Sequence, residues 1–150
     1  MSPAVTPASP EEYPALADLW EASVRATHHF VSEADIRFFK PLVRDAYLAA
    51  VTLRCTRDAS GAVTGFVGVA GGKIEMLFVA PDRFGQGIGS ALLACAVETL
   101  GATLVDVNEQ NERAVAFYKR RSFAVVGRSP LDALGKAYPL LHMALGKVRP

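Results

Sequence analysis

The sequence predicts an α+β protein, with about four helices flanking a mixed six- to seven-stranded sheet. Apolar residues recur at helical spacing over residues 13–43 and alternate with period two over residues 51–79, and helical and strand patterns then alternate after a glycine-rich loop. The chain has 150 residues, 51% of them hydrophobic, enough for a core without a disulfide or a structural metal. We therefore expect a single domain, residues 1–150, with no metal site.

The N-terminal part is expected to form two helices. Residues 9–12 form a capping pattern, in which serine and glutamate satisfy the first backbone amides and proline takes the first helical position. The first helix should run to about Ala26, with its apolar stripe buried. A second capping pattern at residues 32–35 opens a helix through Val43, in which Pro41 should produce a kink or a division.

The middle of the chain is expected to form an antiparallel meander. Residues 51–56 alternate with period two, residues 58–61 have turn composition, and Gly71 and Gly72 suit a tight turn. The other strands of the meander are 63–70 and 73–79. The rest should form a helix at 88–100, a strand at 103–107, a helix at 112–121, and strands at 123–127 and 140–145.

Composition and charge exclude several classes of protein. Sixteen basic side chains stand against 15 acidic ones, a net charge of +1, so the strongly basic face of a nucleic-acid binder is not expected. No signal peptide and no apolar run long enough to span a bilayer is visible, which predicts a soluble cytoplasmic protein. Cys55 and Cys95 lie in apolar runs and are expected to be buried, reduced thiols.

A glycine-rich loop at residues 84–90 carries the first functional signal. Pro81 stops the preceding strand, and the next helix follows three alternating glycines, Gly85, Gly87 and Gly89. Such a loop lets backbone amides approach an anion, and the helix N-terminus adds roughly half a positive charge. The loop lacks the lysine of a nucleotide-triphosphate loop and the spacing of a dinucleotide fingerprint. A purely structural turn is the alternative.

A second motif lies at residues 108–123, where a strand end, an asparagine-rich loop and a short helix follow one another. On this helix, Phe117 and Tyr118 share a face with Ala114. The basic run 119–121 either contacts a phosphate or stabilises the negative end of the helix dipole.

These segments resemble the Gcn5-related N-acetyltransferases, the GNAT family. The matching motifs are the strand 74–79 with Pro81, the loop 85–89, the pattern N-x-x-A-x-x-F-Y from Asn111 to Tyr118, and the ending from Gly127 to Met143. Residues 23–30 also fit a small bacterial subgroup, so the resemblance covers nearly the whole chain. It implies the GNAT fold, in which two splayed central strands hold acetyl-CoA, and transfer of an acetyl group to a primary amine.

The resemblance also implies which residues bind acetyl-CoA. The pyrophosphate would lie on the amides of residues 84–90 and the pantetheine arm between strands 76–79 and 103–107, with amides near Phe78 and Val79 directed at the thioester carbonyl. The family usually has arginine or glutamine where Phe84 stands, so backbone contacts are expected there. The full set is Leu77, Phe78, Val79, Phe84, Gly85, Gln86, Gly87, Ile88, Gly89, Ser90, Asn108, Asn111, Phe117 and Tyr118.

Two side chains are expected to move protons. Tyr118 matches the general acid of the family, which protonates the leaving thiolate. Glu75 is the candidate base, because strand alternation should turn it away from Ile74 and Met76 and into the cleft. An ordinary solvated glutamate is the alternative for Glu75, and Asp106 is a weaker candidate together with Glu109.

The acceptor site is expected between the two N-terminal helices. His28, His29 and Phe30 lie there, and either imidazole could act as base or contact the acceptor. His142 is more typical of a structural histidine. The acceptor is expected to be an amine, with peptidyl lysine, an N-terminal amine or a small molecule left open, and homodimerisation is common in the family. A non-catalytic acyl-CoA sensor is the alternative function; the presence of both Tyr118 and Glu75 favours the enzyme.

Overall fold

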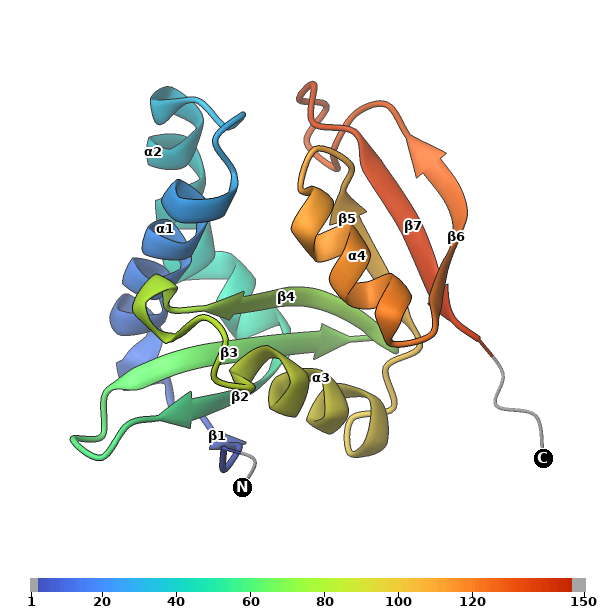
Figure 1. Cartoon of the computed structure of the whole chain (residues 1–150). Coiled ribbons are helices and arrows are strands. Elements are labelled where there is room, and N and C mark those ends of the chain that lie inside the picture. Colours follow the sequence, from blue (N-terminus) through green and yellow to red (C-terminus); the bar gives the residue numbers. More distant parts are fainter. Residues whose placement is uncertain (1–2, 147–150) are drawn as a thin grey trace. The chain divides into compact units, whose positions relative to one another are not determined.

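The computed structural model describes residues 3–146 and divides into two compact units, Met1–Ala102 and Thr103–Pro150 (Figure 1). The helices and strands of the first unit are β1 (Thr6–Pro7), α1 (Tyr13–Thr27), α2 (Glu33–Leu42), β2 (Thr52–Arg57), β3 (Val63–Ala70), β4 (Lys73–Val79) and α3 (Ile88–Glu98). Those of the second are β5 (Leu104–Asn108), α4 (Glu112–Arg120), β6 (Phe123–Ser129) and β7 (Leu140–Leu145). The expected α+β class is confirmed.

The strands of the first unit run in the order β1-β2-β3-β4, each antiparallel to its neighbour. The predicted meander is confirmed, and Gly71 and Gly72 at its second turn both have positive φ. Strand β1 was not predicted, since two residues that include a proline carry no period-two pattern. β1 covers the edge of β2, where Thr6 lies opposite Cys55.

Helix α1 begins as the capping pattern predicts. The Glu12 carboxylate accepts a hydrogen bond from the Ser9 N–H at 3.1 Å, and Pro10–Glu12 form a short 3₁₀ turn before the helix. The helix buries its apolar face against one side of the sheet. The core formed there is Leu16, Ala17, Leu19, Trp20, Val24, Ile36, Val43, Leu48, Leu53, Cys55, Phe66 and Met76.

Helix α2 is not divided at Pro41. It continues to Leu42 and then widens into a π-helical segment, Val43–Tyr47. Proline has no N–H to give to the carbonyl four residues earlier, so the regular α-helical hydrogen-bond pattern is interrupted there. The helix type changes two residues after Pro41, and this change is how the expected interruption appears.

Helix α3 packs against the other side of the sheet, over Gly65 of β3. A Cβ added at Gly65 would lie 2.7 Å from Ile88 Cγ2 and 3.0 Å from Leu92 Cδ1. We expect Gly65→Ala to lower the free energy of unfolding by about 1–3 kcal/mol, because the extra methyl group overpacks a filled contact. Urea denaturation of the two proteins measures the difference.

The control for this substitution is Gly127→Ala in β6. There the added Cβ would meet its nearest atom, His142 Cδ2, at 3.5 Å, an ordinary contact. Its stability should stay equal or rise slightly, because alanine costs less backbone entropy than glycine in a strand. Equal losses in the two variants would contradict close packing at Gly65.

In the second unit, β5 and β6 both pair antiparallel with β7. Strand β6 reaches Ser129, two residues beyond the predicted end, and a bulge lies between Val125 and Gly127. Helix α4 ends at Arg120, and Ser122 follows with a positive φ of 72°. Such a residue stops a helix, because the left-handed conformation cannot continue it.

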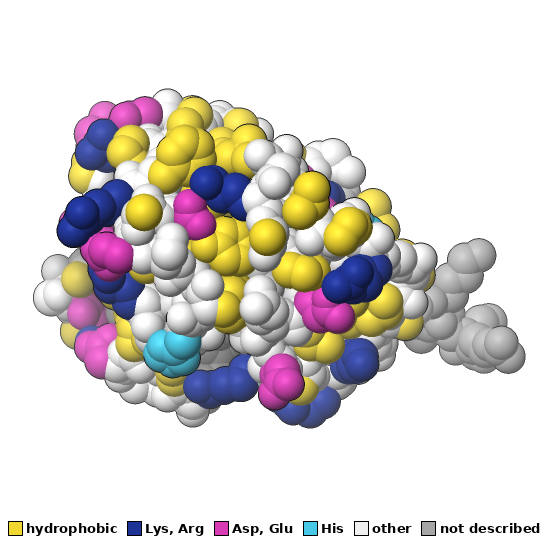
Figure 2. All heavy atoms as spheres, turned by 90° about the horizontal axis from the view of Figure 1, so that it is seen from above, with side chains coloured by type: hydrophobic (Ala, Val, Ile, Leu, Met, Phe, Trp, Pro, Cys, Tyr) yellow, Lys and Arg dark blue, Asp and Glu magenta, His cyan; other side chains and the backbone are white. Residues whose placement is uncertain are grey.

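The surface has mixed charge, and the two cysteines are unpaired. Charged side chains of both signs are interspersed on the face shown in Figure 2, with hydrophobic ones among them. Cys55 is buried as expected but Cys95 is half-buried, and both are free thiols. Among residues 3–146, no helix has the length and apolar character needed to cross a membrane.

Candidate functional site

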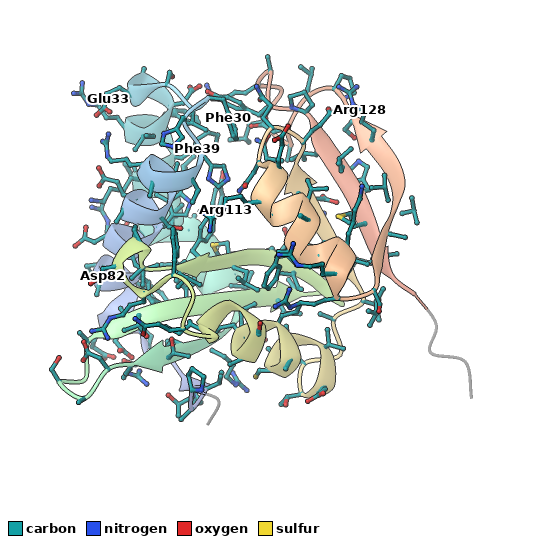
Figure 3. The ribbon with its side chains drawn as sticks, in the orientation of Figure 1. Phe30, Glu33, Phe39, Asp82, Arg113 and Arg128 are labelled. Atoms are coloured by element: carbon teal, nitrogen blue, oxygen red, sulfur yellow. The ribbon has the colours of Figure 1, made fainter. Side chains whose placement is uncertain are left out.

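The glycine-rich loop is held at its start and open along its length. The segment Pro81–Arg83 forms a 3₁₀ turn, and the Arg83 guanidinium donates to the Asp58 carboxylate at 3.2 Å. Figure 3 labels Asp82 in this turn. Gly85 and Gly87 follow with φ of +81° and +82°, and a Cβ at either would meet nothing within 4 Å. The glycines are therefore required by backbone conformation, and the space beside them is open.

The N-terminus of α3 is suited to bind an anion. Gly87 is its N-cap and has no side chain with which to cap the first-turn amides. Ala91 donates to the Gly87 carbonyl at 3.0 Å, so the amides before Ala91 lie in the first turn, at the positive end of the helix dipole. The loop and the first turn of α3 bring the predicted phosphate-binding residues to one place. The side chain of Ile88 is buried, which leaves its amide for such a contact.

The end of β4 corrects one expectation about the backbone amides. The Ala80 N–H donates to the Thr64 carbonyl on the β3 side at 2.8 Å. Because amides of alternate residues in a strand point the same way, the Phe78 N–H also points toward β3, whereas the Val79 N–H points away from it. Phe78 lies opposite Phe66 in the ladder. Of the two amides expected to face the thioester, that of Phe78 is therefore excluded.

A bulge in β4 corrects the reasoning about Glu75. Val69 pairs with Ile74 but Gly68 pairs with Met76, so Glu75 is an extra residue in β4. Met76 consequently joins the core under α1, whereas Ile74 shares a face with Val69 toward α3. Glu75 cannot face away from both neighbours, as strict alternation would require. Its side chain is exposed.

His28 lies at the end of α1 and is largely shielded from water. Its Nδ1 is 2.7 Å from Thr27 Oγ1, and its ring centroid lies 5.3 Å from that of Phe30 and 6.4 Å from that of Phe78. Burial, with a smaller contribution from the charge of His29, lowers the pKa of His28 to about 4. His29 itself is exposed. Of the predicted acceptor residues, the structure therefore brings His28 and Phe30 against each other and leaves His29 in solvent.

The depressed pKa of His28 predicts a pH dependence of stability. The unfolded chain takes up this proton near pH 6.5 but the folded chain only near pH 4, so the free energy of unfolding should fall as the pH drops through that window. An NMR titration of the imidazole should give a midpoint near 4. The variant His28→Gln should show a flatter fall in stability from pH 7 to 5. A midpoint near 6.5 in the folded protein would contradict the prediction.

Helix α4 presents Tyr118 within an aromatic cluster. The Tyr118 ring makes edge contacts with Phe117 and Phe123, at centroid distances of 5.1 and 5.5 Å. Burial raises the pKa of the Tyr118 hydroxyl, so the side chain stays protonated at neutral pH. Asn111 caps the helix, as expected, and its Oδ1 accepts from the Ala114 N–H at 3.2 Å.

The segments before and after α4 are also held by hydrogen bonds. Asn108 Oδ1 accepts from the Gln110 N–H at 3.0 Å. Arg121 Nη1 donates to the Phe117 carbonyl at 3.1 Å, and its guanidinium lies 3.9 Å from the centre of the Phe117 ring. Arg121 therefore stabilises the C-terminal end of α4, one of the two roles considered for the basic run.

A hydrogen-bonded group of three side chains links the strands of the second unit. His142 Nδ1 lies 2.6 Å from Asp106 Oδ1, and His142 Nε2 lies 2.6 Å from Ser129 Oγ. The group spans β5, β7 and β6 and gives His142 the expected structural role. Glu109 is bonded to Arg128 at 2.8 Å, and Figure 3 shows Arg128 on β6. Both weaker candidate bases, Asp106 and Glu109, thus have partners.

Thr27, Ser129 and the contact between Asp58 and Arg83 carry no sequence signal of their own. Each acts through a partner that becomes visible in the folded chain: Asp58 and Arg83 are 25 positions apart, and Ser129 and His142 are 13 apart. Thr27 is adjacent to His28, but a threonine before a histidine is not a motif. Its role depends on the rotamer seen in the structure.

Comparison with known proteins decides the family. Residues 44–125 match the family model described as Acetyltransferase (GNAT) domain. The chain belongs to the GNAT family. It is 41% identical over 133 residues to "Peptidyl-lysine N-acetyltransferase YjaB" of Salmonella typhimurium, which covers 89% of this chain and 91% of the relative. The corresponding Escherichia coli protein is 40% identical over 134 residues, 89% of this chain and 90% of the relative.

The GNAT fold is confirmed by a solved structure. The solution structure of apo YjaB from Escherichia coli aligns with a TM-score of 0.88 and 36% identity, covering 99% of this chain and 100% of that one. This GNAT protein is accordingly an N-acetyltransferase that uses acetyl-CoA as co-substrate and an amine as acceptor. Its relatives are enzymes, which favours the enzyme over the acyl-CoA sensor.

Proposed function

We propose that this GNAT protein acetylates the side-chain amine of lysine residues in peptides or proteins. The observation that carries the proposal is its 40–41% identity, across most of both chains, to two proteins named as peptidyl-lysine N-acetyltransferases. A small-molecule amine and an N-terminal amine are the other acceptors considered.

In this proposal the first unit binds the donor. The amides of the loop and of the first turn of α3 hold the pyrophosphate, which the left-handed glycines and the glycine N-cap of α3 support. The Val79 N–H is directed at the thioester carbonyl, where it would stabilise negative charge as it develops. Leu77 and the side chain of Phe78 remain proposed contacts of the pantetheine arm.

The second unit contributes Tyr118 as the general acid. Its raised pKa keeps the proton on the hydroxyl until a thiolate leaves. Phe117, Asn108 and Asn111 are proposed contacts of acetyl-CoA. The Oδ1 atom of each asparagine accepts a backbone hydrogen bond, which orients its side-chain amide. Glu75 stays a candidate base.

The experiment uses one peptide sequence in two forms, each with one of its two amines blocked by acetylation. The full chain is incubated with acetyl-CoA and a lysine peptide whose N-terminus is acetylated, and the product is located by tandem mass spectrometry. The matched peptide has a free N-terminus and an acetylated lysine. Acetylation of the first peptide at Nε is the expected result. Acetylation of the second alone would overturn the lysine assignment in favour of an N-terminal amine.

We also propose that the two units form one functional acetyltransferase domain, since a single relative matches the chain along nearly all of its length. Its free cysteines suit the reducing cytoplasm. Homodimerisation stays a prediction, which the molar mass from light scattering would test.

A further inference from the structure

The hydrogen bonds of Thr27 determine which nitrogen of His28 carries the proton. Thr27 Oγ1 lies 2.7 Å from the Ser23 carbonyl oxygen and 2.7 Å from His28 Nδ1. The carbonyl can only accept, so the single hydroxyl proton of Thr27 goes to Ser23. Toward His28 the hydroxyl can then only accept, so Nδ1 must be the donor. Neutral His28 therefore carries its proton on Nδ1 and its lone pair on Nε2.

The backbone and ring of His28 are held in place. Its N–H donates to the Val24 carbonyl at 2.7 Å, and its own carbonyl accepts from the Val31 N–H at 2.9 Å. The ring stacks at an angle against Phe30, which Figure 3 shows on the connection after α1, and against Phe78. Phe78 precedes Val79, whose amide points away from β3. The imidazole therefore lies beside the end of β4, where the acetyl group is proposed to bind.

We propose that Thr27 is a positioning residue that fixes the tautomer of His28, and that His28 Nε2 is the proton acceptor for the attacking amine. The inference rests on the proposed function. The amine nitrogen forms a bond to the acetyl carbonyl carbon, and the carbon–sulfur bond breaks. The nitrogen becomes strongly acidic as its bond forms, and its proton passes to Nε2. The sulfur leaves with a proton from the general acid, which regains one from solvent, and His28 returns its own proton to solvent.

The two candidate bases differ in exposure, because His28 is largely shielded from water and Glu75 is exposed. The imidazole is neutral at neutral pH, because burial lowers its pKa, so the base form is present and a cationic lysine is not repelled. The exposed His29 beside it lowers this pKa further. Glu75 is exposed at the bulge of β4, where water competes for its carboxylate.

The test separates the effect of the Thr27 hydroxyl from a general disturbance of the end of α1. Thr27→Val removes the hydroxyl and should lower kcat at least about fivefold with the KM for acetyl-CoA within about twofold. Thr27→Ser keeps the hydroxyl and should recover most of the rate. Thr52→Val, at an exposed position of β2, is the matched control and should behave as the parent protein. Nitrogen-15 NMR of the imidazole should show the Nδ1–H form in the parent and Thr27→Ser proteins, and a tautomer mixture in Thr27→Val.

Three results would overturn the inference. One is a parent protein with its proton on Nε2. Another is a Thr27→Val variant that keeps both the full rate and the tautomer. The third is a large loss of rate in Glu75→Gln beside an unchanged rate in His28→Gln, which would make Glu75 the base. If the parent protein acetylates no lysine peptide, the proposed function fails instead, and the NMR comparison still decides whether Thr27 fixes the tautomer.

Discussion

Replacing Tyr118 by phenylalanine is expected to lower kcat for acetyl transfer at least about tenfold, within the ~10²–10⁴-fold range that general acids typically supply. The change deletes one hydroxyl and leaves the ring to pack against Phe117 and Phe123, so the fold should persist. Acetyl-CoA affinity should stay within about twofold, since the hydroxyl acts on the leaving thiolate. Rates of thiol release and calorimetric titration with acetyl-CoA measure the two quantities.

The control is Tyr13→Phe at the start of α1, which deletes a tyrosine hydroxyl from a side chain packed against the core of the first unit. It should retain the parent rate. Because burial raises the pKa of Tyr118, the parent enzyme should also keep its acid in the protonated form above pH 10. An unchanged kcat in Tyr118→Phe would refute the role of general acid.

Gly87→Val is expected to weaken acetyl-CoA binding at least about tenfold. A β-branched residue is strongly disfavoured at a φ of +82°, a strain of about 1–3 kcal/mol, so the loop should leave the conformation that directs its amides toward one point. Titration of the pure protein with acetyl-CoA, beside ATP and NAD, gives the affinity and its selectivity.

The control is Gly61→Val, which introduces a similar backbone strain in a different turn. Gly61 has a φ of +89° in the turn between β2 and β3, and a Cβ there also meets nothing within 4 Å. This variant should lose a similar amount of stability and keep its affinity for acetyl-CoA. Parent-like affinity in Gly87→Val would mean that the loop is a structural turn, the alternative considered from the sequence.

The elements that could be predicted from the sequence are those with local causes. The capping pattern at Ser9 and Glu12 needs contacts three residues apart, and the turn at Gly71 and Gly72 needs the positive φ that glycine tolerates. Strands β3 and β4 begin and end at the predicted residues, which the turns on either side of them determine. The loop before α3 was recognisable for the same reason, since glycine is the residue that tolerates its positive φ angles.

The candidate site was predictable only in part, because several of its features depend on strand register or on a rotamer. The bulge at Glu75 appears when β4 is aligned with β3, and it changes which core Ile74 and Met76 join. Likewise, the sequence does not distinguish the backbone amides of Phe78 and Val79, whereas the pairing of β3 with β4 shows that they point in opposite directions. The Thr27 hydroxyl contacts His28 only in the rotamer seen in the structure, and residue spacing in the sequence does not predict that rotamer.

The extra residue in β4 makes this strand sensitive to length as well as to composition. The alternation of the two halves of β4, before and after Glu75, is out of phase by half a period, so Ile74 and Met76 face opposite layers of helices although they are two residues apart. Removing one residue here would bring the halves into phase and turn Ile74 or Met76 away from its core. A glutamine at position 75 keeps that phase, whereas a deletion changes it, so chemistry and geometry can be altered separately at this one position.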